Sequence, residues 1–316
     1  GETLQNQLIT RAEDISKFAA GLRLTSQNDS SGGLIILRGV RWAPGSGTEA
    51  IPIYLNDISF QPGDVLQSLF DIEQVEVLRG PQGTIRGAPS IAGAVTITSR
   101  KPDLDQFGGY ASGLLGTHNR WYVQGAVNAP IITDKLAIRI AGMVDNSEAN
   151  RVHSLAPGAK SPRLRTENIR ASLQFQPTDA LSINASYQYM KNSGTIYTQV
   201  AGPGSPGVPA RNIPANFNGP ALEADDYKGV SDLGRDAKAS RQLITVNATW
   251  DVLGQRLSYN YGYRHAGDGG SANVDVGNVV PGFDRRSSDG PQPPQGKSYY
   301  NVHELRLSSI RGGDRF

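Results

Sequence analysis

Residues 72–102 read IEQVEVLRGPQGTIRGAPSIAGAVTITSRKP and combine two alternating segments with a loop of closely spaced glycines. Val75 and Val77 alternate with Glu76 at the two-residue period of a half-buried strand, and residues 94–98 repeat this period. The loop between the two segments is marked by Gly80, Pro81, Gly83, Gly87 and Gly93. Because glycine accepts positive φ and close approach of the backbone, this spacing indicates a tightly packed loop between two strands.

This stretch resembles the end of the plug domain of TonB-dependent outer-membrane receptors. The resemblance extends upstream, where residues 34–40, LIILRGV, are similar to the "IRG" strand of the family. Residues 51–58, IPIYLNDI, are similar to its "VYVDGV" strand, with Asn56-Asp57 in place of the usual Asp-Gly. One departure is Arg86, where many members carry an aromatic residue. The resemblance implies a small plug domain that is followed by a transmembrane β-barrel.

Local patterns upstream of residue 102 fit a small α+β domain. A capping box at residues 10–13 predicts a helix that ends near Gly21, because the Thr and Glu side chains satisfy free backbone amides there. A second short helix is predicted to start at Asp64 and to bury the apolar residues that follow it. Together with four strands, these helices predict a plug domain over residues 1–102.

Residues 103–316 alternate between apolar and polar side chains in a series of segments typical of β-strands. The strands are predicted at 107–116, 119–130, 136–145, 166–176, 181–189, 241–251, 256–265 and 299–309. Most have the length of about 9–11 residues that a tilted strand needs to cross a bilayer. Eight strands are about a third of a plugged barrel with 22 strands. We therefore expect the chain to be a fragment: an N-terminally incomplete plug and the first strands of an antiparallel transmembrane barrel.

Connection lengths give the barrel interpretation its strongest support. Residues 131–134, 177–179 and 252–255 are short turns, whereas residues 191–240 and 266–298 are long and polar. Short and long connections therefore alternate along the chain, and residues 117–119 are the exception, a short connection on the side that should be external. In an outer-membrane barrel every second connection lies on the same side, with short turns in the periplasm and long loops outside. A soluble sandwich or propeller gives no reason for this segregation.

Three tyrosines on one predicted strand allow two interpretations. Tyr259, Tyr261 and Tyr263 share one face. They fit an aromatic girdle at the level of the lipid headgroups. They fit equally well a tyrosine ladder on any half-buried sheet.

Composition excludes several classes of protein. The 31 basic and 29 acidic residues nearly cancel, so the charge gives no reason to expect nucleic acid as a partner. The chain has no cysteine, which excludes disulfides, thiolate metal sites and a cysteine nucleophile. No apolar run reaches the length of about 18 residues that a membrane helix requires. A closed barrel remains possible because it satisfies its own backbone hydrogen bonds.

Motifs for cofactors, metals and catalysis are weak. Residues 202–207 satisfy GxGxxG but lie in a proline-rich stretch that cannot open a helix, and residues 296–298 only imitate the end of a phosphate loop. The histidines are scattered without the spacing of metal ligands; they are His118, His153, His265 and His303. We therefore predict no cofactor, no metal site and no enzymatic activity.

Two arginines are the candidate residues that hold the plug in the barrel. Arg38 and Arg79 each precede a plug glycine, Gly39 and Gly80. In the resembled family, arginines of these two motifs pair with glutamates of the barrel wall, so the resemblance implies a locking role for both. The partner glutamates are expected in barrel strands beyond the eight predicted here. The alternative is that both arginines are solvated at strand ends.

The resemblance also implies the function. It predicts active import of a scarce solute across the outer membrane of a Gram-negative bacterium, with TonB, outer-membrane lipid and a small-molecule cargo as partners. Ferric siderophores are the commonest cargo of the family; haem, cobalamin and oligosaccharides are alternatives. The substrate-binding residues cannot be identified from the sequence. A periplasmic α+β domain fused to an adhesion-type β domain is the competing class, without transport.

Overall fold

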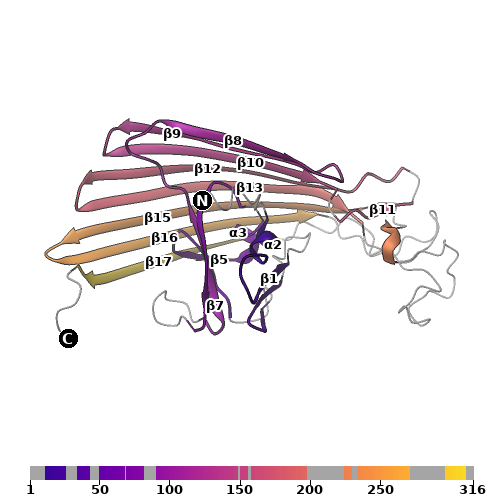
Figure 1. Cartoon of the computed structure of the whole chain (residues 1–316), viewed down its shortest axis with the longest axis horizontal. Helices are drawn as coiled ribbons and strands as arrows, with labels where there is room; N and C mark the ends of the chain where they lie inside the picture. The colour runs from indigo at the N-terminus through magenta and orange to yellow at the C-terminus, as the bar shows by residue number, and fades with distance from the viewer. Residues whose placement is uncertain are drawn as a thin grey trace.

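The computed structural model describes residues 11–25, 34–42, 50–67, 69–81, 90–148, 150–155, 158–197, 224–229, 234–270 and 296–310. Eight long strands form one antiparallel sheet in the order β17-β16-β15-β13-β12-β10-β9-β8. The shorter elements of the N-terminal part gather against one face of this sheet (Figure 1). The long sheet is the barrel wall, and the N-terminal part is the plug.

All eight predicted barrel strands are present, and each pairs with its neighbour along the chain. Their bounds are β8 Gly108–Leu115, β9 Trp121–Ile132, β10 Leu136–Ser147, β12 Arg163–Thr178, β13 Leu181–Ile196, β15 Arg235–Val252, β16 Gln255–Gly270 and β17 Lys297–Ser309. Several are longer than predicted, and β15 reaches 18 residues. The alternation of apolar and polar residues therefore identified the strands, but not how far they continue into the long loops.

The connections are segregated as expected, except that residues 116–120 join β8 to β9 by a short connection at the end opposite the short turns. Short turns join β9 to β10, β12 to β13 and β15 to β16 at one end of the sheet (Figure 1). Leu253 and Gly254 have φ of 51° and 75°, as a two-residue hairpin with a type I′ turn requires. The described elements of the long connections lie at the other end; they are β11 (His153–Ser154), β14 (Lys228–Gly229) and η2 (Ala224–Asp226).

The two faces of the sheet are clearly distinct, as β10 shows. Ile140 is 51% exposed and points away from the plug, whereas Ala141 is 2% exposed and points towards it. Tyr259, Tyr261 and Tyr263 lie on the outward face at successive levels, opposite Leu305, His303 and Asn301 of β17. These tyrosines therefore form a row along the outward face of β16, and their place in an aromatic girdle stays a prediction.

The described part of the plug contains seven strands where four were predicted, because two of the expected strands are hairpins and β1 was not predicted. One sheet has the order β1-β2-β3 and the other the order β5-β4-β7-β6. Residues 34–40 were expected as one strand, but φ values of 52° at Arg38 and 84° at Gly39 turn the chain back on itself. Asn56 and Asp57, with φ of 50° and 67°, turn residues 51–58 in the same way. The bounds are β1 Leu22–Thr25, β2 Leu34–Leu37, β3 Val40–Trp42, β4 Ile53–Leu55, β5 Ile58–Phe60, β6 Ile72–Arg79 and β7 Gly93–Ser99.

Two short helices complete the described part of the plug. Helix α2 covers only Ala12–Ile15 and does not continue to Gly21 as expected; the capping residue Thr10 lies outside the described residues. Helix α3, Pro62–Val65, starts before the predicted Asp64, since proline fits the first helical turn. No helix among the described residues is long and apolar enough to cross a membrane.

The core of the plug extends into the barrel wall. Its fully buried residues include Ile53, Phe60 and Val95, and Leu243 of β15 belongs to the same cluster. Tyr300 and Val302 of β17 pack against it. The plug therefore shares a continuous core with the wall in this region. The expected boundary at residue 102 stays a prediction; β7 ends at Ser99 and β8 begins at Gly108.

Candidate functional site

The contact between the plug and the barrel wall is the candidate functional site, and its charged part consists of two plug aspartates and four wall arginines. Asp64 of α3 is 1% exposed and lies between two arginines of neighbouring strands. Its Oδ2 accepts a hydrogen bond of 2.6 Å from Arg264 Nε on β16, and its Oδ1 lies 3.0 Å from Arg241 Nε on β15. Burial raises the pKa of the Asp64 carboxyl, and the two guanidinium groups counteract this by favouring the carboxylate.

Asp71, directly before β6, makes the second charged contact. It is 3% exposed, and Arg139 of β10 donates two hydrogen bonds to it, of 2.8 Å from Nε and 2.6 Å from Nη2. Such a bidentate pair fixes geometry as well as charge. Arg170 of β12 lies beside it, 2% exposed, and its Nη1 is 3.5 Å and 3.4 Å from the backbone oxygens of Phe70 and Asp71. We call these six residues the arginine contacts.

Apolar contacts reinforce both aspartates. The guanidinium carbon of Arg170 lies 4.4 Å from the centre of the Phe70 ring, within the range of a cation–π interaction. Phe70 is buried in a cluster with Tyr122, Ala126 and Met143 of the wall. On the other side, a Cβ at Gly262 of β16 would overlap Ile58 of the plug. At Gly262 the wall therefore leaves room for the side chain of Ile58 of the plug.

A third charged contact, after those of Asp64 and Asp71, joins the plug to the wall near the long connections. Arg11 Nε lies 3.2 Å from Asp145 Oδ2 of β10, and Arg120 Nε lies 3.6 Å from the other carboxylate oxygen. The Arg11 side chain is 38% exposed, so water screens this pair more than the arginine contacts.

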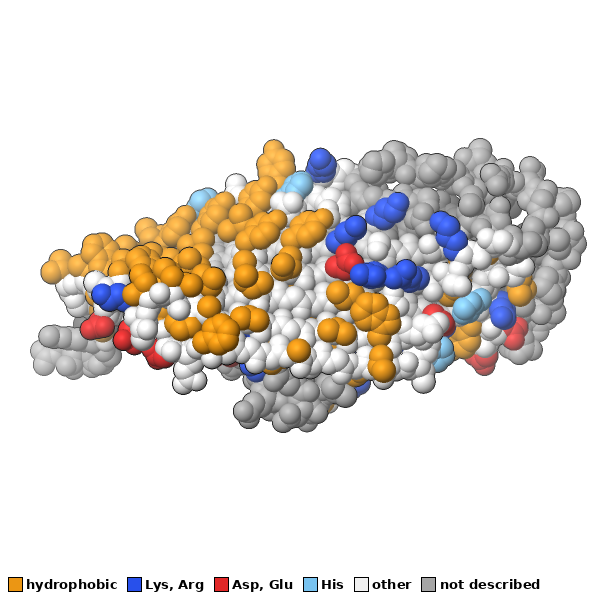
Figure 2. Space-filling view, turned by 90° about the horizontal axis from the view of Figure 1, so that it is seen from above, with side chains coloured by type: hydrophobic (Ala, Val, Ile, Leu, Met, Phe, Trp, Pro, Cys, Tyr) orange, Lys and Arg blue, Asp and Glu red, His pale blue; other side chains and the backbone are white. Residues whose placement is uncertain are grey.

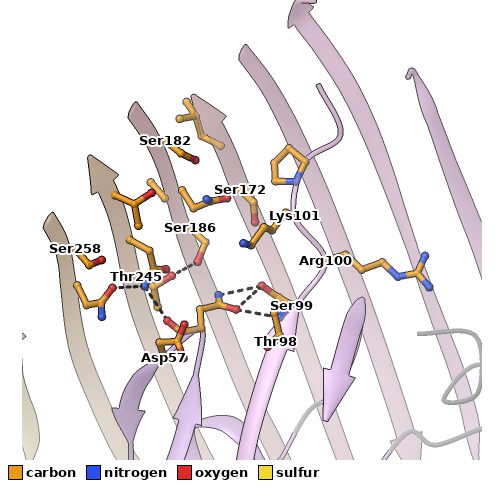
Figure 3. Close-up of a pocket in the computed structure, with 18 of the residues that line it drawn as sticks. Asp57, Thr98, Ser99, Arg100, Lys101, Ser172, Ser182, Ser186, Thr245 and Ser258 are labelled. Atoms are coloured by element: carbon orange, nitrogen blue, oxygen red, sulfur yellow. Dashed lines mark hydrogen bonds between the residues drawn. The ribbon is translucent and has the colours of Figure 1, made fainter. Parts of the chain in front are cut away.

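A polar chamber of about 290 Å³ lies between the plug and the wall. The plug lines it with the β4–β5 turn and with residues 98–102, which lead towards the barrel. The wall lines it with short hydroxyl and amide side chains; they include Ser172, Ser182, Asn184, Ser186, Thr245, Asn247, Thr249, Ser258 and Asn260. In Figure 3, Ser186 and Thr245 face the plug turn at Asp57, and Lys101 reaches towards the wall while Arg100 points away.

Neutral hydrogen bonds cross and border this chamber. Asn247 Nδ2 donates to the backbone oxygen of Asn56 at 2.9 Å, which links the wall to the plug turn. The Asn56 amide is held in place within the plug, because its Oδ1 accepts a hydrogen bond from Ser99 N at 3.0 Å. Ser186 and Thr245 bond to each other at 2.7 Å across two wall strands (Figure 3). The chamber can therefore hold water and polar solute atoms without breaking an ion pair.

The predicted site residues lie elsewhere in the plug. Arg38 sits in the exposed β2–β3 turn, and Arg79 is exposed at the end of β6. Neither makes an ion pair with another residue in the described part of the chain, so their locking role stays a prediction. Among the motif glycines, Gly39, Gly80 and Gly93 have φ of 84°, 94° and 143°. Pro81 is exposed; Gly83 and Gly87 lie outside the described residues.

The sequence did carry a usable indication of the arginine contacts. Arg139, Arg170, Arg241 and Arg264 each occupy the inward face of a membrane-length strand, where charged residues are costly unless they have a partner. The partner aspartates were harder to find, because Asp64 also fits a helix start. In the described part of the chain, no group of three or more His, Asp or Glu residues is arranged to hold a metal ion.

Comparison with known proteins agrees with this architecture. Residues 1–94 match the family model of the TonB-dependent receptor plug domain. The pesticin receptor of Yersinia pestis is 27% identical over 123 residues, 39% of this chain and 18% of the receptor. The catecholate siderophore receptor Fiu of Escherichia coli K12 is 30% identical over 141 residues, 44% of this chain and 17% of the receptor. The matched stretches thus span under a fifth of each relative.

Solved structures extend the match to the whole chain. The ferric yersiniabactin uptake receptor FyuA from Yersinia pestis superposes with a TM-score of 0.74 at 18% identity, over 99% of this chain and 45% of FyuA. The open form of Fiu superposes with a TM-score of 0.59 at 17% identity, over 96% of this chain and 42% of Fiu. At these identities the structures establish the fold.

A plug seated against the inward face of an antiparallel sheet of membrane-length strands defines the class of plugged β-barrel receptors. The family match assigns residues 1–94 to the plug domain of TonB-dependent receptors, and the superpositions show that the chain has the fold of such a plug with the first strands of its barrel.

Proposed function

We propose that the chain is part of a receptor that imports a ferric siderophore across the outer membrane of a Gram-negative bacterium. The observation that carries this proposal is the seating of Asp64 and Asp71, buried against arginines of the wall. A barrel of about 22 strands encloses a wide lumen, so the plug seals it at rest and is rearranged when the solute passes.

Import against such contacts requires external work. Removing one partner from a buried ion pair typically costs about 3–5 kcal/mol, because the other charge is left unpaired. The plug has two such aspartates, and both would separate from the wall if this side of the plug moved. This supports coupling to an inner-membrane energy source through TonB.

The charge of the wall favours an anionic cargo. Four wall arginines face two plug aspartates at the arginine contacts, so movement of the plug would uncover a net positive wall. An anionic ferric siderophore gains from this field, whereas a neutral oligosaccharide gains little. The names of the relatives point the same way, because they describe a pesticin receptor and a catecholate siderophore receptor.

Uptake by a strain that lacks the receptor tests the proposal. The strain is complemented with the full-length gene, and the uptake of iron is measured from a ferric catecholate, a ferric hydroxamate and haem, with and without TonB. We expect TonB-dependent uptake from one siderophore class. Uptake of iron from haem alone would show that the cargo is haem and not a ferric siderophore. A full-length protein that shows no heat-modifiable migration on a gel would instead support a binding module without a barrel.

A further inference from the structure

The inward face of the wall next to the short turns carries a grid of hydroxyl and amide side chains. Hydrophobic side chains cover the outward face of this part of the sheet (Figure 2). On the inward face, strand register places one amide row across four neighbouring strands; it consists of Gln174, Asn184, Asn247 and Asn260. A hydroxyl row lies on each side of it: Ser182, Thr249 and Ser258 towards the short turns, and Ser172, Ser186 and Thr245 away from them. We call these residues the polar grid, and all except Gln174 line the polar chamber.

Asn184 is the member of the amide row that lacks a partner for its oxygen. Its neighbours in the row are occupied, because Gln174 Nε2 donates to Ser182 Oγ at 3.0 Å and Asn247 Nδ2 donates to Asn260 Oδ1 at 2.9 Å. Asn184 Oδ1 is buried and accepts no hydrogen bond from the described residues. Since buried amide oxygens are normally hydrogen-bonded, this atom indicates a donor that comes from outside the chain.

Lys101 contributes a positive charge from the plug. In Figure 3 its side chain reaches from the segment after β7 towards the wall. Among the described residues, no carboxylate forms an ion pair with it. The other charged groups that line the chamber are engaged or turned away: Arg306 donates two hydrogen bonds of 2.7 Å to Glu304, Arg100 points away, and Asp57 has interactions of its own. The Lys101 ammonium group is therefore the charge in the chamber that an anion can neutralise.

The size of the chamber limits the ligand to a small metabolite. At about 30 Å³ per water molecule, its volume of about 290 Å³ corresponds to about ten waters. A ferric siderophore is several times larger, so the chamber is not the binding site of the proposed cargo. None of the described lining residues is aromatic, so a flat ring would gain nothing by stacking here. An open-chain molecule with several polar groups fits this lining better.

The position of the chamber indicates where its ligand comes from. Ser182 is the second residue of β13 and Ser258 the fourth residue of β16, and both strands begin at a short turn. Short turns of outer-membrane barrels lie on the periplasmic side. The chamber therefore lies at the periplasmic end of the wall, away from the long connections.

We propose that the polar chamber binds a small polyhydroxylated carboxylate from the periplasm, with its carboxylate at Lys101 and its hydroxyl groups on the polar grid. A hydroxyl group both donates and accepts, so it matches a lining of amides and hydroxyls and supplies the donor that Asn184 Oδ1 lacks. The contact with Lys101 is charge-assisted and therefore stronger than a neutral hydrogen bond. The source of this ligand depends on the outer-membrane location in the proposed function, whereas the site itself does not depend on the cargo.

A bound ligand of this kind bridges the plug and the wall. Lys101 belongs to the plug, whereas the polar grid belongs to β12, β13, β15 and β16. In the structure, the neutral hydrogen bond from Asn247 to the plug turn crosses the same region. The ligand therefore adds contacts where the plug is held without buried charge, and it stabilises the resting position of the plug.

Binding to the purified full-length receptor in detergent tests this assignment. Calorimetric titration compares D-gluconate, which has hydroxyl groups and a carboxylate, with sorbitol, which lacks the carboxylate, and hexanoate, which lacks the hydroxyl groups. We expect gluconate to bind about 5-fold more tightly than either, with its advantage over sorbitol falling as salt rises. Gluconate should also slow hydrogen exchange in residues 56–57 and 98–102. No binding of gluconate, equal binding of sorbitol or hexanoate, or protection confined to other residues would overturn the assignment.

Two variants separate the roles of the charge and the grid. Lys101→Met keeps most of the side-chain length and should weaken gluconate binding about 5-fold, with sorbitol binding unchanged. Asn184→Leu keeps the volume but removes the amide, so it should weaken both ligands. The control Lys135→Met removes a positive charge from a short turn outside the chamber and should change neither. If Asn184→Leu inserts poorly, the exposed position of Lys101 still allows the test. Unchanged gluconate binding in Lys101→Met would overturn the assignment; because neither cargo nor TonB is present, it would leave the import function untouched.

Discussion

The arginine contacts and the polar chamber belong to the same interface between plug and wall, but they hold the plug in different ways. At the arginine contacts, the carboxylates of Asp64 and Asp71 are almost fully buried and each lies within 3.0 Å of a guanidinium group. At the chamber, about 290 Å³ of open space is bordered mainly by hydroxyl and amide groups, together with the charged residues Asp57, Arg100, Lys101 and Arg306. The plug is thus anchored by buried charge in one part and bound by replaceable hydrogen bonds in the other.

This difference suggests where movement of the plug starts. Water can take over the neutral hydrogen bonds around Asn247 at little cost, since each contributes only about 0.5–1.5 kcal/mol. Water cannot easily take over a carboxylate that is buried between two arginines. We therefore expect the chamber side of the plug to loosen first and the arginine contacts to separate last.

The largest effect is expected from Asp64→Asn. The change keeps the size of the side chain but leaves Arg241 and Arg264 without a counter-charge, which should lower stability by about 3–5 kcal/mol. Urea unfolding of the purified full-length receptor measures this loss. The matched control is Asp57→Asn at the chamber, an exposed position where the same chemical change should stay within about 0.5 kcal/mol. Equal losses of stability for the two variants would mean that the arginine contacts and the chamber hold the plug equally strongly.

A smaller loss of stability is expected at the apolar contact between Ile58 of the plug and Gly262 of the wall. In Gly262→Val the new side chain would overlap Ile58, and overpacking of this kind costs about 1–3 kcal/mol. The control is Gly142→Val, because a Cβ there points outward and meets only ordinary contacts. Thermal unfolding of both variants compares the two faces. A greater loss for Gly142→Val would contradict the assignment of the inward face.

The smallest effect is expected inside the chamber. Asn247→Ala removes the hydrogen bonds to Asn56 and Asn260 but leaves their oxygens next to open space that water can fill. We expect a loss of about 1 kcal/mol in urea unfolding. Because the variant weakens the side that should loosen first, it should also raise the sensitivity of cells to large antibiotics slightly. A loss as large as that of Asp64→Asn would refute the idea of a weakly bound side.

Alternation and connection length were sufficient to predict the barrel strands. Strand β10 shows why: Ile140 and Ala141 face lipid and plug, and a period of two residues records that difference directly in the sequence. The plug was harder to predict because its strands are short and buried on both sides. The run LIILRGV is apolar before and after Arg38, so nothing in its hydrophobicity reveals the turn there.

The sequence did not predict the arginine contacts, and the locking role expected for Arg38 and Arg79 stays a prediction. The resemblance directed attention to plug arginines and wall glutamates, whereas the structure pairs plug aspartates with wall arginines. Ion pairs between residues far apart in sequence leave no local pattern. An unpartnered arginine on the inward face of a strand such as β12 is nevertheless a visible anomaly, and it identifies one half of the pair.

The separation between Asp64 and Arg264 has a consequence for how the receptor is built. The two residues are 200 positions apart, and β15, which supplies Arg241, also precedes β16 in synthesis. Asp71 finds its partners on β10 and β12, in the first half of this sheet, whereas Asp64 has its partners only on the later strands β15 and β16. Any folding intermediate that has the plug but lacks β15 and β16 therefore leaves the Asp64 carboxylate without its two counter-charges, and it must keep this group hydrated.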